Sequence, residues 1–240
     1  MRALIGFVLL AGVLSLTFAD HWSVQDGDEV CVVLEANITG NVKYTKITNE
    51  TVEYHFNVTA IDSNGECHTT RKNESVQYLQ IVFLPNNITP PQEEAQQQWK
   101  LTIWFAPGHE QTFRVQDFEL YAFFYKFMNS TVNETTYVRS DHAETEVGAE
   151  GKNAFKCSDS ALGFVDATVN LKNLRVIAFA NLNSTDFPTE QQFEQCSLDA
   201  RTSDIVPIIV GACLAGLVIA VLIAYLIGRA RAKRQGYASV

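Results

Sequence analysis

Apolar and polar residues alternate with a period of two along much of this chain. The segment 51–58 reads TVEYHFNV, in which apolar side chains occupy every second position and Glu53, His55 and Asn57 lie between them. This alternation is typical of a strand with one buried face. Comparable apolar runs predict further strands at Cys31–Leu34, Val42–Ile47, Tyr78–Phe83, Trp99–Phe105, Phe113–Tyr125, Ala167–Leu171 and Arg175–Ala180.

Turn signals separate the predicted strands at Asn64-Gly65, Pro90-Pro91 and Pro107-Gly108. The segments between the runs lack a convincing helical period. No linker, internal repeat or stalk rich in Pro, Ser and Thr precedes Cys196. The pattern therefore predicts one all-β domain.

The apolar segment Ile205–Ile227 differs from these runs because it contains no charged side chain over its whole length. At a rise of about 1.5 Å per residue, a helix of this length crosses a hydrocarbon core of about 30 Å. The segment therefore predicts a transmembrane helix in a lipid bilayer. A cationic cluster that stays on the cytosolic side follows it, at Arg229, Arg231, Lys233 and Arg234.

The N-terminus has the pattern of a secretory signal: Arg2, the apolar run Ala3–Leu16, and then Thr17-Phe18-Ala19, with small residues at the positions that a signal peptidase reads. The run is short for an uncleaved anchor, so we expect cleavage after Ala19. The chain is then a single-pass type I membrane protein. Its expected parts are a signal peptide (1–19), a luminal domain (20–204), a transmembrane helix (205–227) and a cytoplasmic tail (228–240).

Four cysteines fall in the predicted luminal domain, at Cys31, Cys67, Cys157 and Cys196. An even number in an oxidising compartment predicts two disulfides, and four cysteines allow three connectivities. Pairing neighbours closes two loops of similar size, each of which stabilises the fold by about 3–4 kcal/mol. Zinc binding is less favoured, because the chain has no CxxC pair and no histidine at ligand spacing.

N-glycosylation sequons are unusually dense in the same domain. They predict a surface largely covered by sugar, and Asn87 is the weakest candidate because Pro90 follows its Thr89. The acceptor residues are Asn37, Asn49, Asn57, Asn73, Asn87, Asn129, Asn133 and Asn183.

The charge distribution argues against a nucleic-acid partner. All 27 acidic residues fall within 20–204, whereas Arg2 and the tail hold five of the 18 basic ones. The acidic luminal domain repels nucleic acid. The five histidines are scattered and no catalytic, metal or phosphate-binding motif is present. Carboxylate pairs such as Glu93-Glu94 sit in polar segments, where solvated loop residues are favoured over a glycosidase-like pair of acids. We therefore expect no enzyme activity, no catalytic residue, no cofactor and no metal.

The tail ends in Tyr237-Ala238-Ser239-Val240, which matches the tyrosine sorting pattern Y-x-x-Φ. Such a peptide adds to the edge of a sheet in an adaptor, with Tyr237 and Val240 in two apolar pockets. Capture of the C-terminus by a PDZ domain is less favoured, because Ala238 stands where its commonest ligands have Ser or Thr.

Small residues recur every four positions in the predicted span and form a stripe along one helix face. Such a stripe allows close approach of a second helix and so a homo-oligomer through the transmembrane helix, but small residues are also common in spans without that role. Both interpretations stay open. The stripe consists of Ala212, Gly216, Ala220, Ala224 and Gly228.

Several segments resemble the lysosome-associated membrane glycoprotein (LAMP) family nearly residue for residue. They are Cys31–Thr39 (CVVLEANIT), Cys196–Asp199 (CSLD), IVPIIVGA from Ile205 and LIAYLIGR from Leu222. The resemblance covers the whole mature chain. The chain departs from the best-known members by having one domain and no proline-rich hinge, an extra residue before Ile205, and Ala238 after Tyr237.

The resemblance implies a β-prism domain with cysteines paired in order, Cys31 with Cys67 and Cys157 with Cys196. It implies a GYxxΦ sorting signal formed by Gly236, Tyr237 and Val240 and read by clathrin adaptor complexes. The expected location is the lysosomal membrane, reached through late endosomes and the cell surface.

Two functions follow from these observations. The first is a structural glycoprotein that protects and maintains the lysosomal membrane and contributes to lysosome and phagosome biogenesis. The alternative is an endosomal or cell-surface receptor that binds a lipid or protein through an apolar face of the luminal domain. The aromatic run Phe118–Phe127 is the candidate lining, although core packing accounts for it better.

Overall fold

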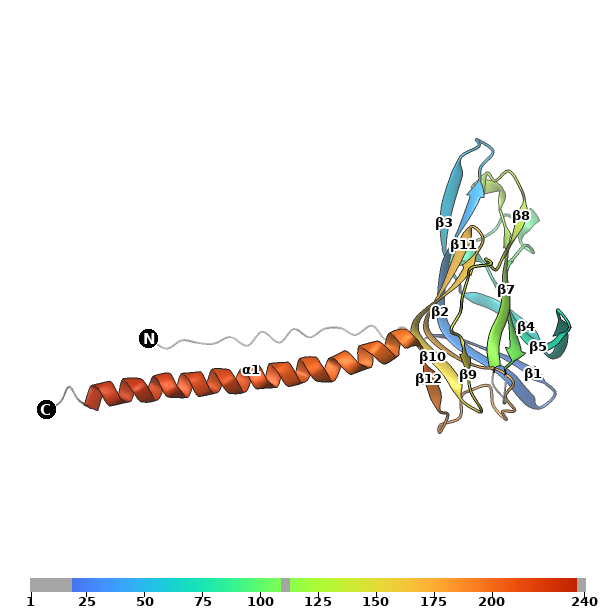
Figure 1. The fold of residues 1–240 in the computed structure, drawn as a ribbon. Helices are drawn as coiled ribbons and strands as arrows, with labels where there is room; N and C mark the ends of the chain where they lie inside the picture. The colour runs from blue at the N-terminus through green and yellow to red at the C-terminus, as the bar shows by residue number, and fades with distance from the viewer. Residues whose placement is uncertain (1–18, 109–112, 237–240) are drawn as a thin grey trace.

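The structure is a computed structural model that describes residues 19–108 and 113–236, with side chains at 201–206, 228 and 230–236 excepted. The predicted signal peptide lies outside the described residues except for Ala19, and so do Tyr237 and Val240 of the predicted sorting signal. Figure 1 shows a β domain from whose side one long helix, α1, projects.

Two six-stranded sheets build the domain, and their strands are antiparallel except for one short parallel pair, β10 with β12. The first sheet has the order β1-β2-β11-β10-β12, with β3 also paired to β2. Its strands are β1 (Asp20–Asp26), β2 (Glu29–Thr45), β3 (Thr51–Asn57), β10 (Ala154–Phe164), β11 (Ala167–Ile177) and β12 (Phe193–Gln195).

The second sheet has the order β4-β5-β6-β7-β8, with β9 also paired to β7. Three single-turn 3-10 helices, η1 (Pro85–Asn87), η2 (Gln92–Glu94) and η3 (Lys126–Met128), lie in its connections. Its strands are β4 (Ala60–Arg71), β5 (Glu74–Phe83), β6 (Trp99–Pro107), β7 (Phe113–Phe123), β8 (Glu134–Val138) and β9 (Gly148–Ala149).

Trp99 marks the centre of the core between the sheets, where its indole is fully buried. Ring centroids of Phe56, Phe83 and Phe124 lie 5.2, 6.0 and 6.4 Å from it, in edge-to-face arrangements. The indole N–H donates a hydrogen bond of 2.7 Å to the carbonyl oxygen of Phe123. The ring thus contributes apolar area from β6 without leaving its one polar atom unpaired.

The structure confirms the alternation that predicted β3, since Phe56 and Val58 are buried whereas Glu53, His55 and Asn57 are exposed. Several boundaries are wrong. Cys31–Leu34 and most of Val42–Ile47 lie in one strand, β2, which ends at Thr45. Ala167–Leu171 and the first part of Arg175–Ala180 lie in β11, which ends at Ile177, and the predicted strand from Phe113 ends at Phe123. In each case the residues between the two predicted runs continue the strand instead of forming a turn.

The turn predicted at Asn64-Gly65 is also wrong, because both residues lie inside β4. A Cβ atom on Gly65 would lie 2.2 Å from the carbonyl oxygen of Tyr78 and 2.5 Å from a methyl carbon of Val24. Glycine is required here because β1 crosses close over β4, not because the chain reverses.

Helix α1 runs without interruption from Ser197 to Gly236. Its apolar stretch Pro207–Ile227 has a mean hydropathy of 2.8, and none of it is buried against the domain. Among the described residues this is the one helix long and apolar enough to cross a membrane. It lies within the span predicted at 205–227.

Candidate functional site: the membrane junction and the glycan acceptors

Two disulfides fix the domain, and they pair the cysteines in chain order. Cys31 on β2 is bonded to Cys67 on β4, with their Cα atoms 5.8 Å apart. This bond joins the first sheet to the second. Cys157 on β10 is bonded to Cys196, the residue immediately before α1. The second bond therefore joins the first sheet to the transmembrane helix.

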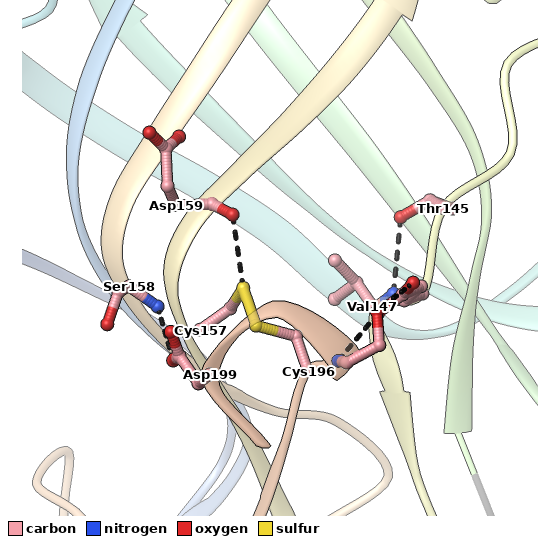
Figure 2. Close-up of a disulfide and its surroundings, with 9 residues drawn as sticks. Thr145, Val147, Cys157, Ser158, Asp159, Cys196 and Asp199 are labelled. Atoms are coloured by element: carbon pink, nitrogen blue, oxygen red, sulfur yellow. Dashed lines mark hydrogen bonds between the residues drawn. A yellow bond between two sulfur atoms is a disulfide. The ribbon is translucent and has the colours of Figure 1, made fainter. Parts of the chain in front are cut away.

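The junction around Cys157–Cys196 is held by further polar contacts (Figure 2). The backbone N–H of Ser158 donates a hydrogen bond of 2.8 Å to a carboxylate oxygen of Asp199 in the first turn of α1. Ser197 donates to Glu146 through its backbone N–H and its hydroxyl, at 3.0 and 2.7 Å. An acidic residue in the first turn also offsets the positive end of the helix dipole.

Cys157, Cys196 and Asp199 are close enough together to resemble a metal site. The two sulfur atoms are bonded to each other, so neither is available as a thiolate ligand. The carbonyl oxygen of Asp159 lies 3.1 Å from the sulfur of Cys157, a contact rather than a hydrogen bond because a disulfide sulfur carries no hydrogen.

The acceptor asparagines of all eight sequons have accessible side chains: Asn37 on β2 is half-buried and the other seven are exposed. Four of them have a positive φ, a conformation that asparagine tolerates in turns. These four are Asn49, Asn73, Asn87 and Asn129. Asn37 and Asn57 lie on strands of the first sheet, and the other six lie in the connections between strands.

The aromatic run Phe118–Phe127 belongs largely to the core. Phe118 and Tyr125 are fully buried and Phe124 is 4% exposed. Phe127 is the exception, with 54% of its surface exposed. The receptor interpretation thereby loses most of the lining that it required.

A buried carboxylate, missed in the sequence analysis, lies on the outer face of the second sheet. Asp117 on β7 accepts hydrogen bonds from Lys72 at 2.9 Å and Arg71 at 3.1 Å, and from the backbone N–H of Phe118 at 3.0 Å. The Arg71 guanidinium also stacks 3.7 Å above the Trp104 ring. This cluster of Arg71, Lys72 and Asp117 ties the β4–β5 turn to the centre of the sheet.

Burial raises the pKa of Asp117, but the hydrogen bonds from Lys72, the Phe118 amide and Arg71 outweigh it, so that the pKa is lowered. The sequence does carry a signal of this site. Two consecutive polar residues, Gln116 and Asp117, break the alternation of β7, and the structure has a β-bulge there opposite Trp104 and Phe105.

The predicted sorting signal lies at the end of the described chain. Gly236 is the last residue of α1, and Tyr237 and Val240 fall outside the described residues. The small residues of the predicted stripe lie on α1 within or just beyond its apolar stretch.

Comparisons with known proteins find the same family for the span and for the domain. The family model described as "Lysosome-associated membrane glycoprotein 2, transmembrane segment" matches residues 206–238. Lysosome-associated membrane glycoprotein 1 of Gallus gallus is 40% identical over 113 residues, which are 46% of this chain and 26% of that protein. The same protein of Bos taurus is 25% identical over 227 residues, covering 92% of this chain and 48% of the relative. This chain thus spans about half the length of the bovine relative.

Solved structures show the same fold at lower identity. The membrane-proximal domain of mouse LAMP-1 superposes with a TM-score of 0.56 at 17% identity, covering 75% of this chain and 98% of that one. Human LAMP-3 superposes with a TM-score of 0.52 at 19% identity, covering 75% of this chain and 100% of that one. The two-sheet domain therefore has the fold of these domains.

Proposed function

Because the chain belongs to the lysosome-associated membrane glycoprotein family, we propose that it is a heavily N-glycosylated type I protein of the lysosomal and late endosomal membrane. Its role is structural. The sugar-covered luminal domain shields the limiting membrane from hydrolases and helps to maintain it, and it contributes to lysosome and phagosome biogenesis.

The accessibility of the sequon asparagines is the observation that carries this proposal. Asn37 is half-buried and the other seven are exposed, on a domain with two disulfides, one between the two sheets and one at the start of α1. Oligosaccharides block the approach of proteases, and disulfides limit the local unfolding that proteolysis requires. A hydrolase-resistant layer is the function that needs both.

The tail supports delivery to that compartment. We propose that Gly236, Tyr237 and Val240 form a GYxxΦ signal that clathrin adaptor complexes bind by strand addition. The proximity of the signal to α1 requires an adaptor that docks flat on the membrane, where the basic residues after Gly228 face anionic lipid. A homo-oligomer through the small-residue stripe of α1 is a separate proposal, tested by cross-linking in the membrane.

Resistance to lysosomal proteases tests the structural role. The full-length protein in detergent is incubated with a lysosomal protease extract at acidic pH, with its N-glycans intact or enzymatically removed. We expect the deglycosylated protein to be degraded several-fold faster while a non-reducing gel shows both disulfides intact. Equal resistance of the two forms would show that the sugars do not protect the domain, and a receptor role would then be the better account.

A further inference from the structure

Phe127 is an exposed aromatic residue in an otherwise buried run. Its ring lies parallel to that of Tyr125, at a centroid distance of 5.7 Å, so one face is turned toward the protein. The side chain nevertheless exposes 54% of its surface. The outer face of the ring therefore offers a flat apolar surface on which another group can pack.

The turn that carries Phe127 is held rigidly by its neighbours. The hydroxyl of Tyr125 donates a hydrogen bond of 2.8 Å to the carbonyl oxygen of Gln97. The hydroxyl of Tyr44 donates one of 3.2 Å to the carbonyl oxygen of Met128, whose own side chain is buried. Because η3 is held on both sides of Phe127, a group that packs on the ring orders little additional backbone.

Asn129 follows directly as the residue that ends η3, in the left-handed conformation with φ 51° and ψ 39°. It is the acceptor of the sequon Asn129-Ser130-Thr131, and its Cα lies at most about 7 Å from that of Phe127, since only Met128 stands between them. The first sugar attached to the side-chain nitrogen of Asn129 is therefore within reach of the Phe127 ring.

We propose that Phe127 is the binding platform for the N-acetylglucosamine residue attached to Asn129. One face of the sugar ring carries only C–H groups, which pack on an aromatic ring with apolar burial and weak C–H to π attraction. Ile47 adds a second apolar group beside Asn129: its backbone N–H donates a hydrogen bond of 2.8 Å to the Asn129 carbonyl oxygen, and its side chain is 67% exposed.

This arrangement distinguishes Asn129 from the other acceptors. Phe127 is the one Phe, Tyr or Trp that stands two residues before a sequon asparagine in this sequence. The residues in that position before the other acceptors are Glu35, Ile47, His55, Arg71, Pro85, Thr131 and Asn181.

The location gives this sugar a structural role in addition to shielding. The β2–β3 turn of the first sheet meets the η3–β8 loop of the second here, through a bridge between Lys46 and Ser130 and a hydrogen bond of 2.9 Å from the Thr131 N–H to the Thr45 carbonyl oxygen. Figure 1 shows β3 and β8 at the same end of the domain. A sugar packed on Phe127 and Ile47 would cover this junction and stabilise it.

A double-mutant cycle on the full-length glycoprotein in detergent tests the proposal. The thermal unfolding midpoint is measured for the wild type, Phe127→Ala, Asn129→Asp and the double variant, and mass spectrometry records the occupancy of each sequon. Asp is chosen because it tolerates the left-handed conformation. We expect loss of the glycan to lower the midpoint by about 2–4 °C when Phe127 is present and by little when it is replaced.

Two controls make the cycle specific. Asn183→Asp removes a glycan that follows Asn181, so its effect should be the same with and without Phe127. Phe127→Tyr keeps a flat ring and should retain the coupling that Phe127→Ala abolishes.

The inference rests on the proposed glycosylation, and the outcomes separate the two. If Asn129 carries no glycan in the wild type, both the proposed glycosylation at this position and the Phe127 platform are overturned. If Asn129 is glycosylated but Asn129→Asp lowers the unfolding midpoint equally with Phe127 and with Phe127→Ala, the glycosylation stands and the platform is overturned.

Discussion

Asp117 is a buried carboxylate that neighbouring hydrogen-bond donors hold in its charged form. Its side chain is 9% exposed and lies beside Arg71, 27% exposed, and Lys72, 68% exposed. The lowered pKa keeps the carboxylate charged when the surroundings are acidified. A carboxylate with a lowered folded pKa contributes stability above its unfolded pKa, and this contribution is lost as the pH falls through the folded pKa.

Replacing Asp117 should therefore destabilise the protein in a pH-dependent way. We expect Asp117→Asn to lower the free energy of unfolding by about 1–3 kcal/mol at neutral pH and nearly as much at about pH 5, since breaking hydrogen bonds to a charged, buried group has this cost. The difference should narrow only below the unfolded pKa of about 4, as the wild-type carboxylate becomes protonated. Denaturant unfolding across this pH range measures it.

A matched change at an exposed carboxylate serves as the control. Glu190→Gln, on the loop before β12, removes the same charge from an exposed side chain and should change stability little at any pH. An Asp117→Asn effect that persists undiminished at the lowest pH would contradict the role assigned to the charge.

At the residue scale, the disulfides were predicted from the sequence, whereas the glycosylation of the sequons stays a prediction. The break in alternation at Gln116-Asp117 is visible in the printed chain, but the site that it marks was missed. The role of Gly65 was not predictable, because the atoms that exclude a side chain come from Val24 and Tyr78 on two other strands. Glycine is favoured both in turns and where two strands approach closely, so the residue type alone does not distinguish the two.

At the element scale, β12 and the start of α1 connect the β domain to the membrane helix. β12 has three residues and pairs only with β10, in parallel. Phe193 of β12 and Phe187 on the loop before it pack on Arg175, whose guanidinium carbon lies 4.6 and 4.7 Å from their ring centroids. So short a strand depends on such packing and on the Cys157–Cys196 bond that follows it.

Removing this disulfide should loosen the junction more than the rest of the domain. A Cys157→Ala, Cys196→Ala double variant is expected to lose about 3–4 kcal/mol of stability, with backbone hydrogen exchange rising first at Phe193–Gln195. The matched Cys31→Ala, Cys67→Ala variant should instead increase exchange in β2 and β4. Hydrogen exchange followed by mass spectrometry separates the two patterns, and identical patterns would contradict separate roles for the two bonds.

At the element scale, strands that contribute many core residues were predicted and those that contribute few were missed. β1, β4 and β8 lie at sheet edges, and β4 buries one side chain, Cys67. Such strands bury few apolar side chains, so their sequences show little of the apolar–polar alternation that predicts a strand. β10 lies inside its sheet but carries Ser158, Asp159 and Ser160 in sequence, which hid its periodicity.

At the scale of the whole molecule, a rigid disulfide-linked domain is joined directly to a membrane helix. α1 has 40 residues, about 60 Å of helix at a rise of about 1.5 Å per residue. About half of that length crosses the hydrocarbon core, and the remainder extends the helix on both sides. The sequence predicted this plan from hydropathy and charge alone, because a bilayer selects for the length and composition of one continuous segment.

The steady-state location of the full-length protein is the most direct test of the account. Wild type, Tyr237→Ala and the matched control Ser239→Ala are compared by overlap with a lysosomal marker and by surface labelling. The account predicts that wild type and Ser239→Ala reside in lysosomes, while Tyr237→Ala accumulates at the cell surface because the adaptor loses its aromatic anchor. Wild-type protein that remains at the surface to the same extent as Tyr237→Ala would contradict the account.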